Sequence, residues 1–369
     1  MIFSIVIFII TLLILVLVHE FGHFIMAKKF GIKVLEFGFG LPPRVWGKKI
    51  GETLFSLNLL PLGGFVKLLG EDDLPAGKQE ADKKVLNDSR SFAKAKVEKR
   101  IVTVLAGVVM NLLLAWVLFY FVIIQQGFRI IYPTADPGVF IARTETGFPA
   151  QTAGVKIGDR LLTINGKKVD DVEEAVAEIK GANGQPLRLE LADLEGNFKR
   201  VISLTPKENT KGEKLIGVVF SPVGFKVYET FWERIFSGVT YSYDLTRLTF
   251  VGLGRLLADA ITGNFEKASA SVSGPVGLAR VTNNILSAGV EAVIPYLWFS
   301  GVISLTLAIF NVLPIPALDG GRLFFLVIEA VTRKKVHVEI ERMIHNVGFA
   351  LLIALSLLVA LSDIRKQFP

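Results

Sequence analysis

The stretch His19-Glu20-Phe21-Gly22-His23 decides how this chain is interpreted, because it places an H-E-x-x-H pattern at the end of an almost wholly apolar run. On a helix, positions four apart share one face, so both imidazoles can bind the same metal ion. Glu20 then lies beside the open coordination position as a general base. Charged groups are costly at membrane depth, so these residues are functional candidates, and the pattern indicates metal-assisted peptide hydrolysis within a bilayer.

The composition indicates membrane spans joined to a soluble part. The chain has 369 residues, of which 51% are hydrophobic, and a mean hydropathy of +0.51, which is too apolar for an ordinary soluble enzyme. The formal net charge is +7, but the Lys and Arg residues cluster beside apolar segments, so we expect no nucleic-acid partner. Because the chain has no cysteine, any metal must be held by His and carboxylate groups.

Four apolar segments are long enough to cross the ~30 Å hydrocarbon core of a bilayer, which needs about 20 residues. We therefore predict a multi-pass α-helical membrane protein. The third segment ends where Pro314 and Pro316 should break the helix. The first is interpreted as a retained span, because it lacks a basic leader region and a small-residue cleavage site. The four predicted transmembrane helices are residues 2–26, 101–124, 292–313 and 344–362.

Charge and composition orient the chain and divide it into four parts. Loops rich in Lys and Arg should be cytoplasmic, which applies to residues 28–100 and to the loop before the fourth span. Both termini and the long segment between the second and third spans should then face outward. The predicted parts are a first membrane half at 1–136, an inserted α+β domain at 137–222, amphipathic interfacial helices and a linker at 223–290, and a second membrane half at 291–369.

Local signals predict the elements between the two membrane halves. Asn165-Gly166 is a tight-turn pair after a short strand candidate. Asp171 and Glu174 have capping-box spacing at the start of an amphipathic helix. Residues 227–262 mix aromatic and aliphatic residues with interspersed charges. This mixture favours one or two amphipathic helices at the outer membrane interface over a fifth span.

Asp319 is the candidate third metal ligand. It belongs to residues 311–321, Asn-Val-Leu-Pro-Ile-Pro-Ala-Leu-Asp-Gly-Gly, which taken alone also fit a helix break followed by an N-capping Asp. A two-histidine helix still lacks a ligand, and catalytic zinc commonly takes three protein ligands and leaves a position for water. Two neutral imidazoles and one carboxylate would also lower the charge of Zn²⁺ to about +1, which eases its burial.

His19-Glu20-x-x-His23, followed late in the chain by Asn311 and Asp319 in the motif above, resembles the site-2 protease family of intramembrane zinc metalloproteases. The resemblance covers nearly the whole chain and implies zinc as cofactor, a bacterial inner (cytoplasmic) membrane location and regulated intramembrane proteolysis. The implied partners are the lipid bilayer and single-span membrane substrates, such as anti-sigma factors or signal-peptide remnants, cut after prior trimming. Further stretches resemble the bacterial regulator-of-sigma-E protease branch, namely Gly38-Phe39-Gly40, residues 61–67 and residues 273–277.

The resemblance also concerns two regions outside the spans. Residues 148–166 resemble the PDZ pattern, so the inserted domain is expected to be one extracytoplasmic PDZ-like domain, which either captures a peptide C-terminus or acts only as a gate. Residues 34–68 are expected to form a membrane-associated β-hairpin beside the zinc; a hairpin packed on itself is the alternative. The candidate substrate-contact or transition-state residues are Asn311, Ser56, Asn58, Gly63 and Gly64.

Two rival interpretations predict different site residues. A membrane-anchored PDZ adaptor with a structural metal would not need Glu20 as a base. An H-E-x-x-H membrane protease with a Glu third ligand and a cytosolic site would need neither Asp319 nor histidines at this depth. Among the other polar candidates, Asn111 is interpreted as an amide that joins helices, and His337 and His345 as surface or packing residues.

Overall fold

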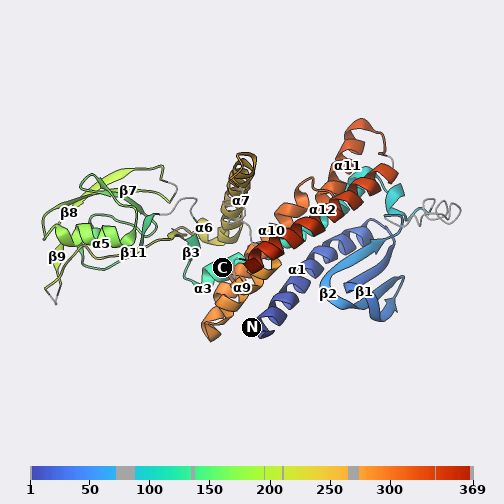
Figure 1. Ribbon diagram of the computed structural model, residues 1–369, viewed down its shortest axis with the longest axis horizontal. Coiled ribbons are helices and arrows are strands. Elements are labelled where there is room, and N and C mark those ends of the chain that lie inside the picture. Colours follow the sequence, from blue (N-terminus) through green and yellow to red (C-terminus); the bar gives the residue numbers. More distant parts are fainter. Residues whose placement is uncertain are drawn as a thin grey trace. The chain divides into compact units, whose positions relative to one another are not determined.

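The computed structural model describes residues 2–71, 88–133, 138–194, 196–209, 212–264, 274–336 and 338–365. Its elements divide into two compact units (Figure 1). The first unit comprises Met1–Phe119 and Leu253–Pro369, so it unites the two ends of the sequence. The second unit is Tyr120–Gly252. His337 and Ser273, both named in the sequence analysis, lie outside the described residues.

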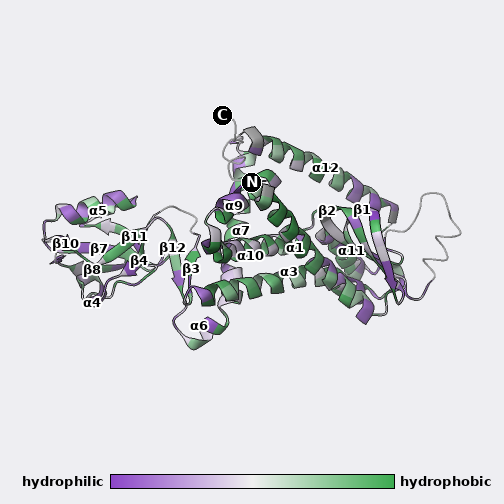
Figure 2. Cartoon of the chain, turned by 90° about the horizontal axis from the view of Figure 1, so that it is seen from below, coloured by the Kyte–Doolittle hydropathy of each residue, from purple (hydrophilic) through white to green (hydrophobic). Residues whose placement is uncertain are grey.

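Among the described residues, four helices are long and apolar enough to cross a membrane, which confirms the predicted multi-pass architecture. Their residues are mostly hydrophobic (Figure 2). The last is the least covered, since only 6% of its apolar window is buried within the chain, as expected of a helix that faces lipid. The four helices are α1 (Ile2–Lys29), α3 (Val97–Gln125), α10 (Val293–Val312) and α12 (Val338–Arg365).

Prolines set the limits of the helices around α10. Leu313 is extended because Pro314 disfavours the helical conformation of the residue before it, so α10 ends as predicted. Pro275 lies in the first turn of the helix it begins, where its missing N–H costs no hydrogen bond. The shorter helices of the first unit are η1 (Phe92–Lys94), α9 (Pro275–Leu286), η2 (Gly289–Ala292) and α11 (Asp319–Thr332).

The predicted hairpin at residues 34–68 is present as a two-stranded sheet of β1 (Val34–Ile50) and β2 (Thr53–Leu68). Its turn contains Gly51, whose φ of 61° is in the left-handed region that favours glycine. β2 packs along α1, the helix that carries the H-E-x-x-H pattern. The hairpin therefore lies beside the predicted metal ligands.

Both strands of this hairpin bend, so that one segment pairs twice. Ser56 pairs with Gly38 and also with Gly47, which leaves its part of β2 flanked by β1 on both sides. Phe65, in contrast, pairs with Gly38 alone. Residues 64–68 therefore form an edge of the sheet, whereas the neighbourhood of Ser56 lies inside it.

The second unit contains the predicted α+β region, built on one sheet with strand order β11-β4-β5-β7-β8 and β6 paired to β5. Its core includes Leu161, Ile164 and Leu189, all buried. Asn165 and Gly166 both have positive φ and connect β5 to β6, as the turn prediction required. The strands of this sheet are β4 (Val139–Thr144), β5 (Arg160–Ile164), β6 (Lys167–Lys168), β7 (Leu187–Ala192), β8 (Arg200–Leu204) and β11 (Val218–Ser221).

Helices and short ladders complete this unit. The predicted N-cap is present, since the Asp171 carboxylate accepts a hydrogen bond from the N–H of Glu174 at the start of α5. Residue 137, the predicted first residue of the inserted domain, lies outside the described residues. The remaining elements before residue 228 are α4 (Pro149–Thr152), α5 (Val172–Gly181), and the strand pairs β9 (Lys207–Glu208) with β10 (Lys214–Leu215) and β3 (Arg129–Tyr132) with β12 (Gly224–Val227).

Residues 227–262 contain two helices, α6 (Phe231–Ile235) and α7 (Ser237–Ile261), in agreement with the predicted helical segment. A capping box begins α6: Thr230 and Glu233 hydrogen-bond each other's backbone N–H groups. The N–H groups of Thr230 and Glu229 hold the pKa of the Glu233 carboxyl below its usual value, because they favour its charged form. α6 also exposes large aromatic side chains, including Trp232, as an interfacial helix would.

Candidate metal centre

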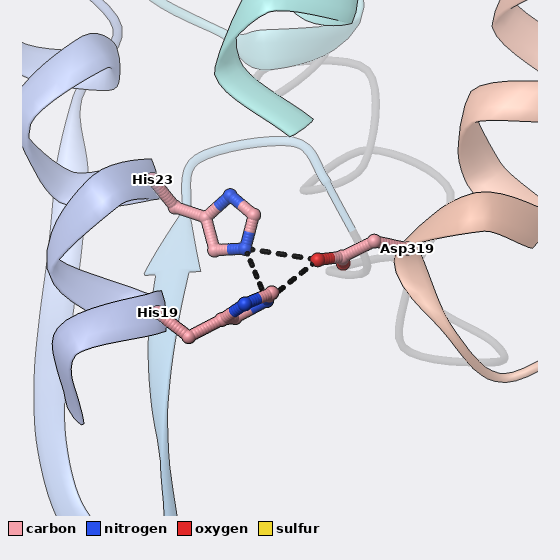
Figure 3. A group of neighbouring side chains, drawn as sticks. All are labelled: His19, His23 and Asp319. Carbon is pink, nitrogen blue, oxygen red and sulfur yellow. Dashed lines mark hydrogen bonds and ion pairs between the residues drawn. The ribbon is translucent and has the colours of Figure 1, made fainter. Parts of the chain in front are cut away.

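Three side chains that are distant in the sequence converge in the first unit (Figure 3). His19 and His23 lie one turn apart on α1, and Asp319 is the first residue of α11. The carboxylate Oδ2 of Asp319 lies 2.7 Å from the Nε2 of His19 and 3.1 Å from the Nε2 of His23. The two Nε2 atoms are themselves 3.1 Å apart. The residues predicted as metal ligands therefore present one atom each to a common point.

The orientation of His23 is fixed by the backbone of α3. Its Nδ1 lies 2.8 Å from the carbonyl oxygen of Thr103. A carbonyl can only accept, so Nδ1 carries the proton and donates it. In the neutral ring the Nε2 of His23 is then the nitrogen with a free lone pair, the arrangement that metal-binding histidines commonly adopt.

The neighbourhood of His19 contains a buried amide from α3. Asn111 is fully buried, and its Nδ2 lies 3.5 Å from the Nδ1 of His19. Within the described residues, the Oδ1 of Asn111 has no hydrogen-bond partner. The backbone oxygen of Asn111 accepts a hydrogen bond from the hydroxyl of Ser304 on α10, 2.8 Å away. The side-chain amide of Asn111 thus links α3 to α1, as predicted, and it does so at a candidate metal ligand.

Gly107 lets α3 approach the two imidazoles closely. A Cβ placed at this position would lie 2.5 Å from the Nε2 of His23 and 2.7 Å from the Nε2 of His19. These are the two atoms that face Asp319, so any side chain here would occupy the space where they converge. Glycine is required at position 107 by this approach and not by an unusual φ.

Glu20 lies between the histidines in sequence and faces the hairpin. Its carboxylate lies close to the backbone N–H of Val66 in β2. A Cβ on Gly64 would lie 3.7 Å from the Cγ of Glu20 and 2.9 Å from the carbonyl oxygen of Gly38. The edge strand at residues 64–68 therefore lies directly beside the candidate base.

A strained loop carries Asp319 into place. Ala317 has a φ of 73°, in the left-handed region that is unfavourable for a residue with a Cβ. Its N–H donates a 3.0 Å hydrogen bond to the Nδ1 of His345 on α12. Gly320 and Gly321 follow, and a Cβ on them would lie 1.9 Å from the oxygen of Leu313 and 2.7 Å from that of Ile315, respectively.

Part-buried ion pairs anchor both ends of α11. The Arg322 guanidinium donates a 2.5 Å hydrogen bond to the carboxylate of Glu71, just beyond β2. Near the other end, Glu329 pairs with Arg100 of α3. These residues line a cavity of about 710 Å³ that also reaches Asp319, so a cavity with charged groups in its wall adjoins the candidate metal ligands.

The candidate substrate residues have different surroundings. Gly63 and Gly64 lie against α1, near Val16 and Leu17. Ser56 and Asn58 are buried inside the sheet, where the Asn58 amide donates hydrogen bonds to the carbonyls of Phe39 and Gly40. Asn311 lies in the last turn of α10 and is half-buried. The hairpin therefore places Gly63 and Gly64 against α1 at the level of Glu20, whereas Ser56 and Asn58 are buried within the sheet.

The donor set fits a zinc ion. Two imidazole nitrogens and one carboxylate oxygen are ligands that Zn²⁺ accepts, and a three-ligand set leaves a position for water. Among the described residues, the clustered group contains Asp319 and no glutamate, in contrast to the rival interpretation with a Glu ligand. The sequence did not indicate Thr103, Gly107 or His345 as neighbours of the site. The i, i+4 spacing of Gly107 and Asn111 was the only local signal that they share a face of α3.

Helices that cross a membrane, together with a histidine-carboxylate cluster and a neighbouring carboxylate, define a membrane metallopeptidase. Residues 7–355 match peptidase family M50, and the chain belongs to that family. The match confirms the predicted site-2 protease family, the predicted enzyme class of metallopeptidase and the predicted zinc cofactor. It also disfavours the alternative of a PDZ adaptor without activity.

Relatives cover almost the whole chain. A Clostridium perfringens protein named as a zinc metalloprotease is 35% identical over 350 residues, which are 95% of each chain. The zinc metalloprotease RasP of Geobacillus kaustophilus is 33% identical and covers 99% of this chain and 98% of its own length. The regulator of sigma-W protease RasP of Bacillus subtilis is 28% identical over 99% of both chains.

Proposed function

We propose that this chain is an intramembrane zinc endopeptidase in which His19, His23 and Asp319 hold the metal and Glu20 is the general base. The observation that carries the proposal is the convergence of the two Nε2 atoms and one carboxylate oxygen, all within 4.8 Å of one another. Glu20 lies one residue after His19, on the helix that supplies both imidazoles. Family membership supports the chemistry, and the position of α1 among the apolar helices supports its location in the bilayer.

Each residue has a distinct task in the proposed hydrolysis. When bound, Zn²⁺ polarises the scissile carbonyl and makes water a better acid. Glu20 takes a proton from the attacking water, whose oxygen forms a bond with the carbonyl carbon. The carbon–nitrogen bond then breaks, and Glu20 returns the proton to the leaving amine. His23 is held for this task by Thr103, and Gly107 keeps the space between the imidazoles open.

Asn111 is proposed to orient His19. The two ends of a carboxamide are nearly isosteric, so Asn111 can turn its Oδ1 toward the Nδ1 of His19. That buried oxygen, which otherwise has no hydrogen-bond partner among the described residues, would then accept a hydrogen bond from the Nδ1–H of His19. Both histidines would consequently have the same tautomer, with an Nε2 lone pair available for the metal.

The edge of β2 is proposed to bind the substrate. A helical substrate hides its amides in hydrogen bonds, and opening several of them in an apolar site without replacement costs several kcal/mol. Pairing with an exposed strand offsets that cost. Residues 64–68 are the edge nearest Glu20, whereas Ser56 is paired on both sides. A proline at Ser56 or Asn58 would therefore disrupt the sheet itself, which makes the edge residues the better test positions.

The substrate class and the topology are part of the proposal. The substrates are single-span membrane proteins such as anti-sigma factors or signal-peptide remnants, in keeping with the sigma-W name of the Bacillus subtilis relative. The second unit is proposed to be an extracytoplasmic PDZ-like domain in a bacterial cytoplasmic membrane, with both termini outside. A single cysteine at Asn197 should then react with an impermeant reagent in intact cells, and one at Lys335 should not; the reverse pattern would invert the topology.

The direct test of the function compares the purified wild type with Glu20→Gln and His19→Ala. The wild type should contain one zinc and cut a single-span model peptide. Glu20→Gln should keep the zinc and lose cleavage, because only the base is removed. His19→Ala should lose both. Cleavage by Glu20→Gln at the wild-type rate would remove Glu20 from the mechanism.

A further inference from the structure

The loop before Asp319 is held in a conformation that its sequence does not favour. Ala317 has a φ of 73° although it is neither glycine nor asparagine. Left-handed conformations of residues with a Cβ persist when the surrounding structure fixes them, and they cluster at functional sites. The strained residue lies two positions before a candidate metal ligand. A contact with the rest of the chain must maintain this left-handed conformation.

One side chain from another helix makes that contact. The Nδ1 of His345 on α12 accepts a hydrogen bond of 3.0 Å from the N–H of Ala317. The same helix touches the loop a second time, since a Cβ on Gly348 would lie 2.3 Å from the Cβ of Pro316. The ring of His345 also packs at a tilt against Phe325 of α11, with ring centroids 6.1 Å apart. His345 is therefore held on one side by the helix that Asp319 begins and on the other by the loop.

The loop has little freedom to relax in any other way. A Cβ on Gly321 would lie 2.7 Å from the carbonyl oxygen of Ile315 and 3.2 Å from the Cε1 of His345. The N–H of Leu318 is bonded to the oxygen of Ile315 at 3.2 Å. A change of conformation at Ala317 would consequently be passed to Asp319, because the residues between them are already packed and bonded.

We propose that His345 is a positioning residue for the metal centre: its hydrogen bond to Ala317 holds the left-handed conformation that brings Asp319 to the two histidines. The inference rests on the proposed role of Asp319 as a metal ligand. His345 itself does not bind the metal. His345 acts through the backbone of Ala317. Any side chain that places a hydrogen-bond acceptor at the Nδ1 position should therefore serve, whether or not it has an imidazole ring.

Four variants separate this role from simple packing. His345→Asn keeps an acceptor at the Nδ1 position, whereas His345→Leu removes it and retains apolar volume. Ala317→Gly removes the strain, because glycine adopts φ near 73° without penalty. The fourth variant combines His345→Leu with Ala317→Gly. Zinc affinity is measured on purified full-length protein by competition with a chromogenic chelator, alongside cleavage of a single-span model peptide.

We expect His345→Leu to bind zinc about tenfold more weakly, the size of the left-handed penalty for a residue with a Cβ. His345→Asn should stay within about threefold of the wild type. The double variant should recover most of the lost affinity, since its loop no longer needs to be held. Wild-type affinity in His345→Leu, or no recovery in the double variant, would overturn the proposal, because simple packing predicts no rescue by a change at Ala317.

A metal-free measurement keeps this test independent of the proposed function. Hydrogen exchange of the Ala317 amide should be slow in the wild type and in His345→Asn, and fast in His345→Leu. Fast exchange in the wild type would overturn the proposal even if the protein bound zinc normally. Zinc binding that survives His19→Ala would instead refute the proposed metal site, while the exchange result would still report on His345 and Ala317. If His345→Leu does not fold, His345→Asn and Ala317→Gly decide the outcome by the same exchange measurement.

Discussion

The two sides of the metal centre are built in opposite ways. The histidine side is a regular helix, in which His19 and His23 share a face because four residues make about one turn. The aspartate side joins an irregular loop with a left-handed alanine to the first turn of α11, where two glycines tolerate no Cβ. Local periodicity positions the first pair, and long-range packing positions Asp319. Substitutions on the histidine side and on the aspartate side should therefore have different effects on zinc affinity and on stability.

The largest expected effect is the removal of a ligand from either side. His23→Ala and Asp319→Ala should each lower zinc affinity by more than about a hundredfold, the upper end for loss of a single outer-shell partner. Peptide cleavage should be undetectable in both. Zinc per chain, measured after dialysis against a weak chelator, checks this. Full zinc occupancy in Asp319→Ala would show that the loop only flanks the metal.

Alanine at two glycines should separate the two sides. Gly107→Ala places a Cβ among the imidazole nitrogens, so zinc affinity should fall by about a hundredfold with little loss of stability. Gly321→Ala meets the backbone of the loop, so it should destabilise the fold by about 1–3 kcal/mol. Thermal unfolding and chelator competition distinguish these outcomes. Gly252→Ala, which meets no atom within 4 Å, is the control. If Gly107→Ala and Gly321→Ala had equal effects on zinc affinity and on stability, the proposed difference between the histidine side and the aspartate side would be wrong.

The ion pair between Glu71 and Arg322 tests how strongly the loop side depends on distant contacts. Glu71→Gln removes the negative charge from a part-buried ion pair, which should cost about 2 kcal/mol of stability. Zinc affinity should fall as well, because Arg322 lies one turn after Asp319.

The exposed pair of Glu52 and Lys28 is the matched control, and Glu52→Gln should leave both quantities unchanged. The Lys28 ammonium holds the pKa of Glu52 below its usual value, so any stability from this pair is present at neutral pH. That contribution is lost as the pH falls through the folded-state pKa. A stability loss in Glu52→Gln as large as that in Glu71→Gln would show that burial is not what distinguishes the two pairs.

The smallest expected effect concerns the amide beside His19. Asn111→Ala should weaken zinc binding by about tenfold, as expected when an outer partner of a ligand is lost. Asn111→Asp keeps an acceptor and should bind zinc more tightly than Asn111→Ala. Isothermal titration of the metal-free proteins with zinc provides the comparison. Identical affinities of the alanine variant and the wild type would mean that Asn111 only joins α3 to α10.

The sequence predicted the parts of this site that local patterns encode. The H-E-x-x-H spacing identifies two residues on one helical face, and the prolines before Asp319 indicate where α10 ends. The four spans follow from runs of apolar residues, and the hairpin was implied by the family resemblance. The sequence could not indicate that a Cβ at Gly107 would collide with two imidazoles, or that His345 reaches Ala317. Those contacts depend on how helices far apart in the chain pack together.

The hairpin also has features that local sequence patterns do not predict. Its existence was implied by the family resemblance, but its double pairing was not. Ser56 and Asn58 were predicted as substrate contacts because they lie in the most strand-like run. The bend in β1 places that run inside the sheet, where Asn58 bonds the carbonyls of Phe39 and Gly40. The unpaired edge of the sheet lies instead at residues 64–68. Strand propensity alone does not distinguish these residues from the segment around Ser56.

His19 and Asp319 are separated by 300 residues. A ribosome that adds about 5–20 residues per second completes the first of them roughly 15–60 s before the second. During that interval α1 has already been made, but the proposed metal centre still lacks its third ligand. The proposed active site can therefore form only after Asp319 has been synthesised. A truncated chain that stalls before α11 is inserted would be harmless to every other membrane helix around it.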